Sequence, residues 1–507
     1  MNRRGPAVAL GAAAVLLLVG AVAAVAPLRA GEIYVQAQND LQASHDTERE
    51  VDIVEDWLDL DLYGDGFQLG IRYSSFAPPD PIVSTDLKSS EGITHRFAEL
   101  QLENTRLRVG TFTRLMGRGL IFRSFENRDL RVDTNLDGLL IEQEGGWWRG
   151  ALLSGRTETG QMETGERRRA DRFSGADMEV DLGRMIVGGS FLAMERPNSP
   201  ARPQLQALRA SLVDGPFTLD WEGARHLPDN PQNDDARGAG QVVETSYLVG
   251  PLGLYAGYKH YNGMSVLTQD QKLMNQPPVL IHDPRATLMN RHPHQLDPND
   301  EKGFLADVSL STPAGEWLVS YAETQNLEAK LGANSFTESF LEWDRYGLGP
   351  FESGHFILDF QQTPYFDTTD LAEPEWVWDY FVTTALDLRL PVYQGTLVGI
   401  WEHQHKQADH VGDYDDELFV LEYEHANGWS LSVLGEFLNW TDEQQVIEGQ
   451  LDPRSRWSGL QVAGPIGDRH TLRVFAGGRR AGYICVGGVC RYEPAFDGIE
   501  LTLISRF

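Results

Sequence analysis

The chain has 507 residues, of which 41% are hydrophobic and 23% are charged, so it is too apolar to be wholly disordered. Its 74 acidic residues outnumber its 43 lysines and arginines, and the net charge of −31 argues against a nucleic-acid binder. The 51 glycines and 10% aromatic residues favour short strands and turns over long helices. Two cysteines are too few for a disulfide-rich scaffold.

The first thirty residues have the pattern of a secretory signal. Arg3 and Arg4 precede an uncharged apolar stretch from Ala7 to Ala26, and the small residue Ala30 offers a cleavage point. An uncleaved membrane anchor is the alternative, because the apolar stretch is long enough to span a bilayer. We expect a signal peptide over residues 1–30, whose three arginines leave with it and change the net charge from −31 to −34.

From about residue 32 to the end, short segments alternate between apolar and polar positions, which is typical of strands with one apolar face. Tight turns, such as Gly64-Asp65-Gly66 and Ala426-Asn427-Gly428, separate paired segments. Short turns at one rim and long loops at the other are typical of an outer-membrane barrel. The longer, charged loops lie at roughly 75–91, 114–133, 156–172, 227–238, 262–302, 363–378, 405–416 and 441–455.

The expected fold is all-β, a single transmembrane antiparallel β-barrel over residues 31–507 with about 24 strands, within a range of 20–26. A secreted soluble β protein shows the same alternation and is the alternative. The chain ends in Phe507 after an alternating strand, which resembles the signal read by the bacterial barrel-assembly machinery. We therefore expect export to the outer membrane of a Gram-negative bacterium, with that machinery, lipid and lipopolysaccharide as partners. The oligomeric state stays open.

A charge that faces lipid costs several kcal/mol near the bilayer midplane, so the charged side chains of the strands are expected to face the lumen. Seven arginines fall within residues 106–137, where a ladder of arginines opposite carboxylates would orient polar solutes. The alternative is that these arginines pair with lumen carboxylates and hold the wall rigid. The candidate pore-lining residues are Glu99, Glu103, Arg106, Arg108, Arg118, Arg123, Glu126, Arg128, Glu422, Glu424 and Arg473.

The long loop 262–302 contains five prolines, so we expect neither a strand nor a regular helix there. It is the candidate plug or constriction of the barrel, and a mobile surface loop is the alternative.

The stretch from Arg108 to Leu130 resembles a family of porin-like bacterial outer-membrane barrels of unassigned function. Members carry a G-x-G-L-x-x-R-x-[YF]-E-x-R run after a strand. The resemblance implies the fold and the compartment and supplies no substrate. The matching positions here are Gly117, Gly119, Leu120, Arg123, Phe125, Glu126 and Arg128.

Two smaller groups of residues could carry chemistry. Cys485 and Cys490 fall in the last external loop, where an oxidising compartment favours a disulfide over a reactive thiol pair. His403 and His405 share one face of an extended segment, and Asp409 follows them. Such a set could bind a divalent cation, although a solvated acidic loop is the simpler interpretation.

The sequence carries no Gly-x-Ser-x-Gly elbow, P-loop or His-Glu-x-x-His motif, so we expect no enzyme and no cofactor. A TonB-dependent transporter is disfavoured, because strand-like residues begin almost at once and leave no room for a plug domain. The predicted function is a porin-like channel for passive passage of small polar solutes. The alternative is a structural barrel sealed by its loops, which binds or helps export a polysaccharide or a secretion partner.

Overall fold

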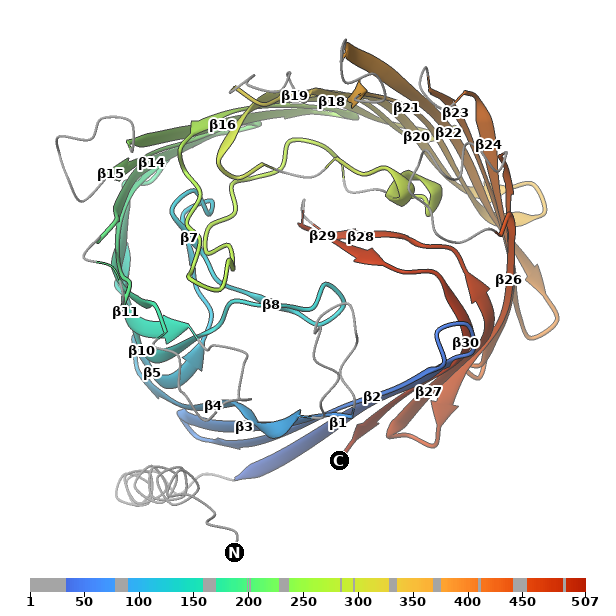
Figure 1. Cartoon of the computed structure of the whole chain (residues 1–507). Helices are drawn as coiled ribbons and strands as arrows, with labels where there is room; N and C mark the ends of the chain where they lie inside the picture. The colour runs from blue at the N-terminus through green and yellow to red at the C-terminus, as the bar shows by residue number, and fades with distance from the viewer. Residues whose placement is uncertain are drawn as a thin grey trace, which may run out of the picture.

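The chain folds into one closed antiparallel β-barrel (Figure 1). The computed structural model describes residues 33–77, 90–157, 170–197, 199, 202–227, 237–282, 285–294, 297–327, 335–367, 375–408, 412–440, 454–486 and 489–507. The predicted signal peptide lies outside the described residues. Twenty-four strands form a single sheet, and the sheet closes because β30 pairs with both β27 and β1. The prediction of an all-β barrel with about 24 strands is therefore confirmed.

Each barrel strand pairs with the next one along the chain, so the topology is a simple up-and-down meander. The strands are β1 (Tyr34–Asp46), β2 (Val51–Gly64), β3 (Phe67–Phe76), β4 (Ser90–Leu102), β5 (Thr105–Phe112), β10 (Leu136–Glu144), β11 (Trp148–Thr157), β12 (Arg172–Asp181), β13 (Met185–Glu195), β14 (Gln204–Asp214), β15 (Phe217–Leu227), β16 (Gly238–Val249), β17 (Leu252–Asn262), β18 (Asp300–Thr312), β19 (Gly315–Gln325), β20 (Ser335–Leu348), β21 (Phe351–Asp367), β22 (Glu375–Val392), β23 (Gly395–Ala408), β24 (Tyr414–His425), β25 (Ser430–Asn439), β26 (Arg456–Ile466), β27 (His470–Arg479) and β30 (Phe496–Arg506).

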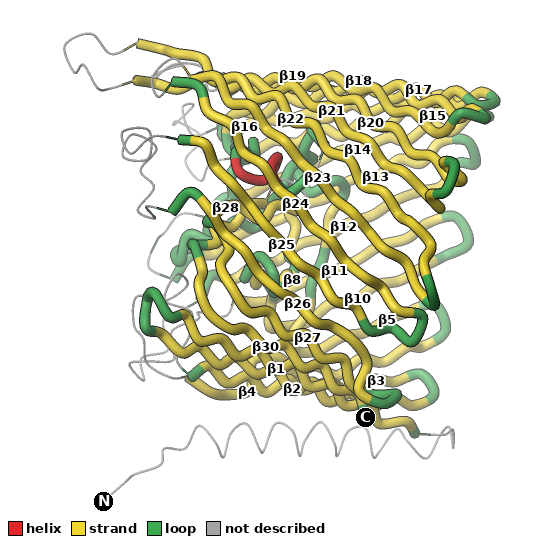
Figure 2. Tube along the Cα trace, turned by 90° about the vertical axis from the view of Figure 1, so that its right-hand side faces the viewer, coloured by secondary structure: helices red, strands yellow, loops and turns green. Residues whose placement is uncertain are grey.

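The two ends of the barrel differ in their connections (Figure 2). Tight turns join the strands at one end, which we call the turn end, and longer connections leave the other end, which we call the loop end. Both terminal strands meet at the turn end, where Phe507 N donates to Ala37 O at 2.8 Å and Ala37 N donates to Phe507 O at 3.1 Å. Among the described residues, no helix is long and apolar enough to cross a membrane.

The outer surface of the barrel wall is largely apolar, and most charged side chains of the strands point inward, the reverse of a soluble protein. Outward-facing Leu208 and Ile499 are 65% and 56% exposed, because no protein atoms cover this surface. Asp359, Glu402 and Asp416 are buried within the barrel. Successive side chains of a strand point to opposite faces, so the alternation in the sequence places these two sets on opposite sides of the wall.

Three long connections fold back into the barrel (Figure 1). Insert A is residues 113–135, insert B is 263–299 and insert C is 480–495. The placement of insert B agrees with the predicted constriction at 262–302. The prediction was wrong to treat 114–133 and the cysteine loop as outer loops. Insert A contains β6 (Leu115–Met116), β7 (Phe122–Arg123), β8 (Glu126–Asn127) and β9 (Val132–Asp133), insert B contains the 3₁₀ helix η3 (Leu288–Arg291), and insert C contains β28 (Gly482–Val486) and β29 (Val489–Glu493).

An apolar cluster explains why insert A folds inward. Four apolar side chains between Met116 and Phe122 would be exposed in an outer loop. Against the wall of β10–β17 these four are buried completely, together with Met264 and Met274 of insert B. Each fully buried large apolar side chain stabilises the docked arrangement by about 1.5–3 kcal/mol. The members of insert A are Met116, Leu120, Ile121 and Phe122.

Candidate functional site: a cavity between the inserts

The Gly-x-Gly motif is where insert A meets both the wall and insert B. Gly117 and Gly119 have φ values of +55° and +89°, which favour glycine. A Cβ at Gly117 would collide with the Glu222 carboxylate of β15, and one at Gly119 would collide with the backbone oxygen of Gln276. Between them, Arg118 N donates to Glu222 Oε2 at 2.7 Å. The motif is therefore a docking device, since only glycine permits this close approach.

The three inserts hold one another in a closed cycle of contacts. Gln276 N of insert B donates to Gly119 O of insert A at 3.0 Å. Arg291 of insert B donates to Ala481 O of insert C at 3.0 Å. Arg491 of insert C donates to Asp129 O of insert A, also at 3.0 Å. Each insert therefore supports the other two, and together they narrow the lumen.

Arginines of insert A attach it to acidic residues of the wall. Arg128 bonds Asp59 at 2.8 Å and Asp40 at 3.3 Å, and Arg131 pairs with Glu55. These three carboxylates lie on β1 and β2, across the lumen from the apolar cluster. Further pairs join Arg114 to Glu142 and Asp177, and Arg118 to Asp220 and Glu244.

Inserts B and C are attached in the same way. Arg291 pairs with Glu436 of β25 at 2.7 Å, and Arg480 of insert C pairs with Asp416 of β24 and lies 3.6 Å from the same Glu436. At η3 the backbone N–H groups of Thr287 and Leu288 donate to Glu402 of β23. The interpretation that lumen arginines pair with wall carboxylates therefore describes the inserts well.

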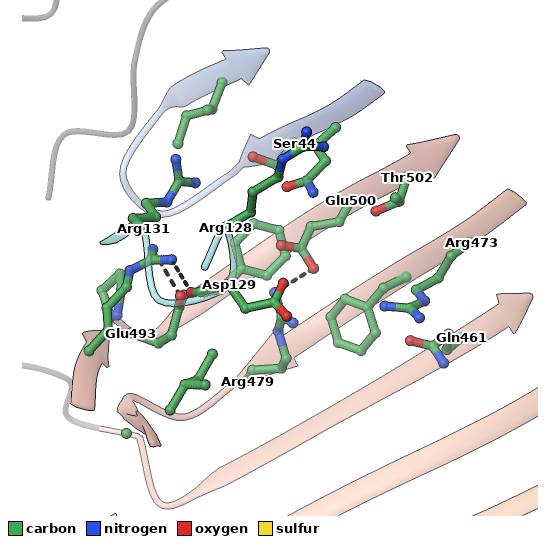
Figure 3. A pocket seen from close by; sticks show the side chains of 18 of the residues that line it. Ser44, Arg128, Asp129, Arg131, Gln461, Arg473, Arg479, Glu493, Glu500 and Thr502 are labelled. Carbon is green, nitrogen blue, oxygen red and sulfur yellow. Dashed lines mark hydrogen bonds and ion pairs between the residues drawn. The ribbon is translucent and has the colours of Figure 1, made fainter. Parts of the chain in front are cut away.

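A cavity of about 850 Å³ remains between the three inserts and the wall (Figure 3). Eight of its lining residues are arginines and six are acidic, although the chain as a whole is strongly acidic. The cavity is thus a locally basic part of an acidic protein. Its arginines are Arg49, Arg128, Arg131, Arg291, Arg473, Arg479, Arg480 and Arg491, and its acids are Asp40, Glu55, Asp129, Glu436, Glu493 and Glu500.

One row of polar side chains in this cavity faces the open space. Arg473 of β27 lies directly opposite Thr502 of β30, which lies directly opposite Gln42 of β1. Gln461 of the neighbouring β26 lies beside Arg473 (Figure 3). Within the described part of the chain, Arg473 has no carboxylate partner, whereas Arg479 pairs with Glu500. The row therefore offers one guanidinium, a hydroxyl and two amides to a solute.

The structure brings several predicted residues together outside this cavity. On β4 and β5, Glu99 accepts from Arg108 at 3.3 Å and lies 3.9 Å from Arg106, which bonds Glu142 at 2.5 Å. These groups form a ladder of ion pairs along the wall. Glu126 of insert A accepts from Arg72 at 2.5 Å, so it links insert A to β3 rather than lining free space.

Arg123 differs from the other predicted arginines. Its guanidinium lies 4.8 Å from the centre of the Phe125 ring, and its side chain is partly buried. Burial lowers the pKa of the Arg123 guanidinium. No carboxylate among the described residues pairs with it.

The remaining predicted residues lie apart. Glu422 and Glu424 share the lumen face of β24 with Asp416, and Glu424 pairs with Arg389 at 3.3 Å. Glu103 is exposed in the turn after β4 with a φ of +48°, so it lies at the turn end and not in the lumen wall. The prediction placed Glu103 in the lumen because it continued the alternation of β4 beyond the end of the strand.

The two predicted histidine ligands point away from the lumen. His403 and His405 do share one face of β23, and each ring already bonds a carboxylate of β24, Glu417 at 2.8 Å and Asp415 at 2.7 Å. Asp409 lies outside the described residues. A different group has the spacing of metal ligands, namely Glu342, Asp344 and His355. Glu342 there already accepts from Arg285 of insert B.

The predicted disulfide is present and bridges Cys485 to Cys490 across the β28–β29 hairpin. Cys485 lines the cavity, so the bridge fixes the hairpin of insert C over it. The acidic partners of insert A on β1 and β2, Asp40 and Glu55, were not predicted. Their alternation with apolar neighbours indicates that these carboxylates face the lumen. It does not identify the arginine that each one contacts.

The fold and the polar lumen define a barrel of the outer-membrane class. A family model matches residues 16–329 and 397–507, and the chain belongs to this family, described as a family of unknown function (DUF6029). No curated protein matches the sequence.

Solved structures agree with this class of fold. The PapC usher in an E. coli P pilus tip assembly intermediate aligns with a TM-score of 0.55 and 9% identity, over 94% of this chain and 61% of that chain. The translocation pore of the P pilus usher PapC gives a TM-score of 0.46 and 11% identity, over 94% and 99% of the two chains. OccK5 (OpdH) from Pseudomonas aeruginosa gives a TM-score of 0.38 and 13% identity, over 72% of this chain and 98% of that chain. At these identities the likeness concerns the fold alone.

Proposed function

We propose that the protein is an outer-membrane channel through which small polar solutes pass passively, along a lumen narrowed by the three inserts. The observation that carries this proposal is the cavity between the three inserts and the wall. A barrel of 24 strands is too wide for its own side chains to fill, so the inserts set the size of the path. The cavity is lined by charged and amide side chains, which are suited to hydrated solutes.

The chemistry of the cavity favours anionic solutes that also carry hydroxyl groups. The guanidinium of Arg473 can take a carboxylate or a phosphate by paired hydrogen bonds. Thr502 and Gln42, opposite it in the same row, can bond hydroxyl groups of the same solute. The excess of arginine over acid in the lining lowers the barrier for an anion, in spite of the acidic chain.

Conductance of the protein in a planar lipid bilayer tests the proposal. We expect discrete current steps, and a reversal potential in asymmetric KCl that shows preference for chloride. Gluconate added to one side should reduce the current more than glucose does. Arg473→Gln should weaken that block about tenfold, because a hydrogen bond to a charged group is worth at least about 1.4 kcal/mol.

The control is Arg469→Gln, which removes the same charge from the adjacent turn and should leave the block unchanged. A folded barrel that carries no current would overturn the channel. Current with cation preference, or an equal block in both variants, would be consistent with a channel but would contradict the proposal that its solute is anionic.

A barrel sealed by its inserts is the second candidate, and the closed cycle of contacts among the three inserts favours it. Such a barrel would bind or help export a polysaccharide or a secretion partner through its outer loops. This candidate predicts that the wild-type protein carries no current in a bilayer. A variant whose insert A is released from the wall should conduct. Arg128→Gln with Arg131→Gln is the variant that tests this.

Placement in the outer membrane also belongs to the proposal. The apolar outer surface and the long connections at one end support it. Export by a signal peptide and recognition of Phe507 by the barrel-assembly machinery remain predictions. Cell fractionation of the full chain and of a variant lacking Phe507 checks both, since the variant should accumulate outside the outer membrane.

A further inference from the structure

A second cavity, of about 750 Å³, lies at the loop end of β11–β14. Its charged lining is four arginines and one glutamate, in a chain with a net charge of −31. This is a stronger local excess of positive charge than in the lumen cavity. The charged residues are Arg156, Arg172, Glu195, Arg196 and Arg202.

Two of these arginines lie on the outer surface of the barrel. Leu153 and Phe173 are buried inside, and alternation along β11 and β12 therefore turns Arg156 and Arg172 outward. Arg156 lies directly opposite Arg172, and like charges in that position destabilise a sheet. Neither forms an ion pair with a carboxylate among the described residues, although Arg172 donates to Ser154 at 3.3 Å. Glu195 lies opposite Arg172 on β13, but it pairs with Arg202 at 3.7 Å. An anion between the two guanidinium groups would remove this repulsion.

The surface below the arginines is apolar, and the basic row continues around the rim. Leu152 of β11 and Leu208 of β14 face outward with exposed fractions of 57% and 65%. Arg225 and Lys302 face outward at the loop ends of β15 and β18. Positive charge above an apolar belt matches an amphiphile whose phosphates stay at the surface while its acyl chains lie against the wall.

We infer that this cavity is a binding site for a phosphorylated glycolipid of the outer leaflet, held through its phosphates by Arg156 and Arg172. The inference goes beyond the proposed solute path and rests only on the proposed place in the outer membrane. Guanidinium groups bind phosphate by paired, charge-assisted hydrogen bonds, which suits arginine better than lysine. Arg196 also donates to Leu267 O of insert B at 2.7 Å, so the site touches the segment that narrows the lumen.

Native mass spectrometry of the detergent-purified full-length barrel tests the site. The probes are bis-phosphorylated lipid A, its dephosphorylated form and inorganic phosphate. We expect wild-type protein to retain the phosphorylated lipid at least about tenfold better than the dephosphorylated form. Arg156→Gln with Arg172→Gln should lose most of this retention. The matched control, Arg184→Gln with Arg469→Gln, removes two arginines from the turn end and should keep it.

Three results would overturn the inference. Equal retention of the two lipids by wild-type protein would do so without any variant, even if the double variant did not fold. Equal loss of lipid retention in the test and control variants would show that retention depends on the total charge and not on this cavity. Displacement of the lipid by inorganic phosphate at equal concentration would make the cavity a site for a free anion and not for a lipid.

Discussion

The two sides of the lumen hold the inserts by different contacts. On the side of β10–β17, buried apolar side chains and the close approach of Gly119 to Gln276 fix inserts A and B, in addition to the ion pairs of Arg114 and Arg118. On the side of β1 and β2, the tip of insert A reaches the wall through Arg128 and Arg131 and their carboxylates. Apolar burial is insensitive to salt, whereas partly exposed ion pairs are screened by it. A path that widens should therefore widen on the charged side.

The largest expected effect comes from breaking the apolar side. Phe122 is fully buried in insert A, so Phe122→Ala should weaken its docking by about 3–5 kcal/mol. We expect higher conductance and fast proteolysis within residues 113–135, while the barrel itself stays folded. The control is Leu115→Ala, because Leu115 lies in the same insert and is 49% exposed. Unchanged conductance in Phe122→Ala would show that apolar packing does not hold the insert.

A smaller effect is expected at the Gly-x-Gly motif. Gly119→Ala places a Cβ against the Gln276 backbone at a φ of +89°, which should cost about 1–3 kcal/mol of docking stability. Gly183→Ala is a matched control, since Gly183 has a φ of +90° and no atom within 4 Å of an added Cβ. Hydrogen exchange of insert A should rise in Gly119→Ala and not in Gly183→Ala. If insert A exchanges equally in the two variants, the close approach of Gly119 to Gln276 does not hold the insert. The motif would then matter only for its positive φ values.

The charged side should respond to salt. Arg128→Gln removes the bonds to Asp40 and Asp59 and should cost about 1 kcal/mol, because these side chains are partly exposed. Raising KCl from 0.1 M to 1 M shortens the screening length from about 10 Å to about 3 Å. Hydrogen exchange at residues 125–133 should then increase in the wild type and change little in Arg128→Gln. An equal response at residues 115–122 would contradict the comparison.

The sequence allowed the barrel to be predicted because its signal is local. Period-two alternation and the rhythm of turns and loops give the strand number without any knowledge of which strands meet. The spacing of Cys485 and Cys490 similarly gives their disulfide. The partners of the inserts could not be predicted in this way, because no local signal identifies them. Arg128 and Asp40 are far apart in the sequence and meet only in the closed barrel. No spacing rule connects Arg114 with Asp177, so the arginine cluster was recognised while its contacts were not.

The smallest expected effect is a pH dependence in the docking of insert B. His282 bonds Asp307 at 3.2 Å and Ser320 at 2.8 Å, with Glu338 and Arg285 also near its ring. Burial alone would lower the pKa of His282, but the hydrogen bond and charge of Asp307 outweigh burial and raise it above 6.5. Protonated His282 therefore stabilises docking fully below about pH 6.5, and this contribution is lost as the pH rises through the raised pKa.

Single-channel recordings between pH 5.5 and pH 8.5 check this sign. Closed periods that end when insert B moves should be longer at the acidic end, and His282→Gln should remove the difference. His260 is a suitable control for the substitution, because it faces outward from the neighbouring β17 and leaves insert B untouched. If closed periods lengthen with rising pH in the wild type, protonation of His282 loosens the insert. The partners of His282 lie on β18 and β19, so a pH response of either sign would place a charge-controlled contact of insert B next to the apolar side of the lumen.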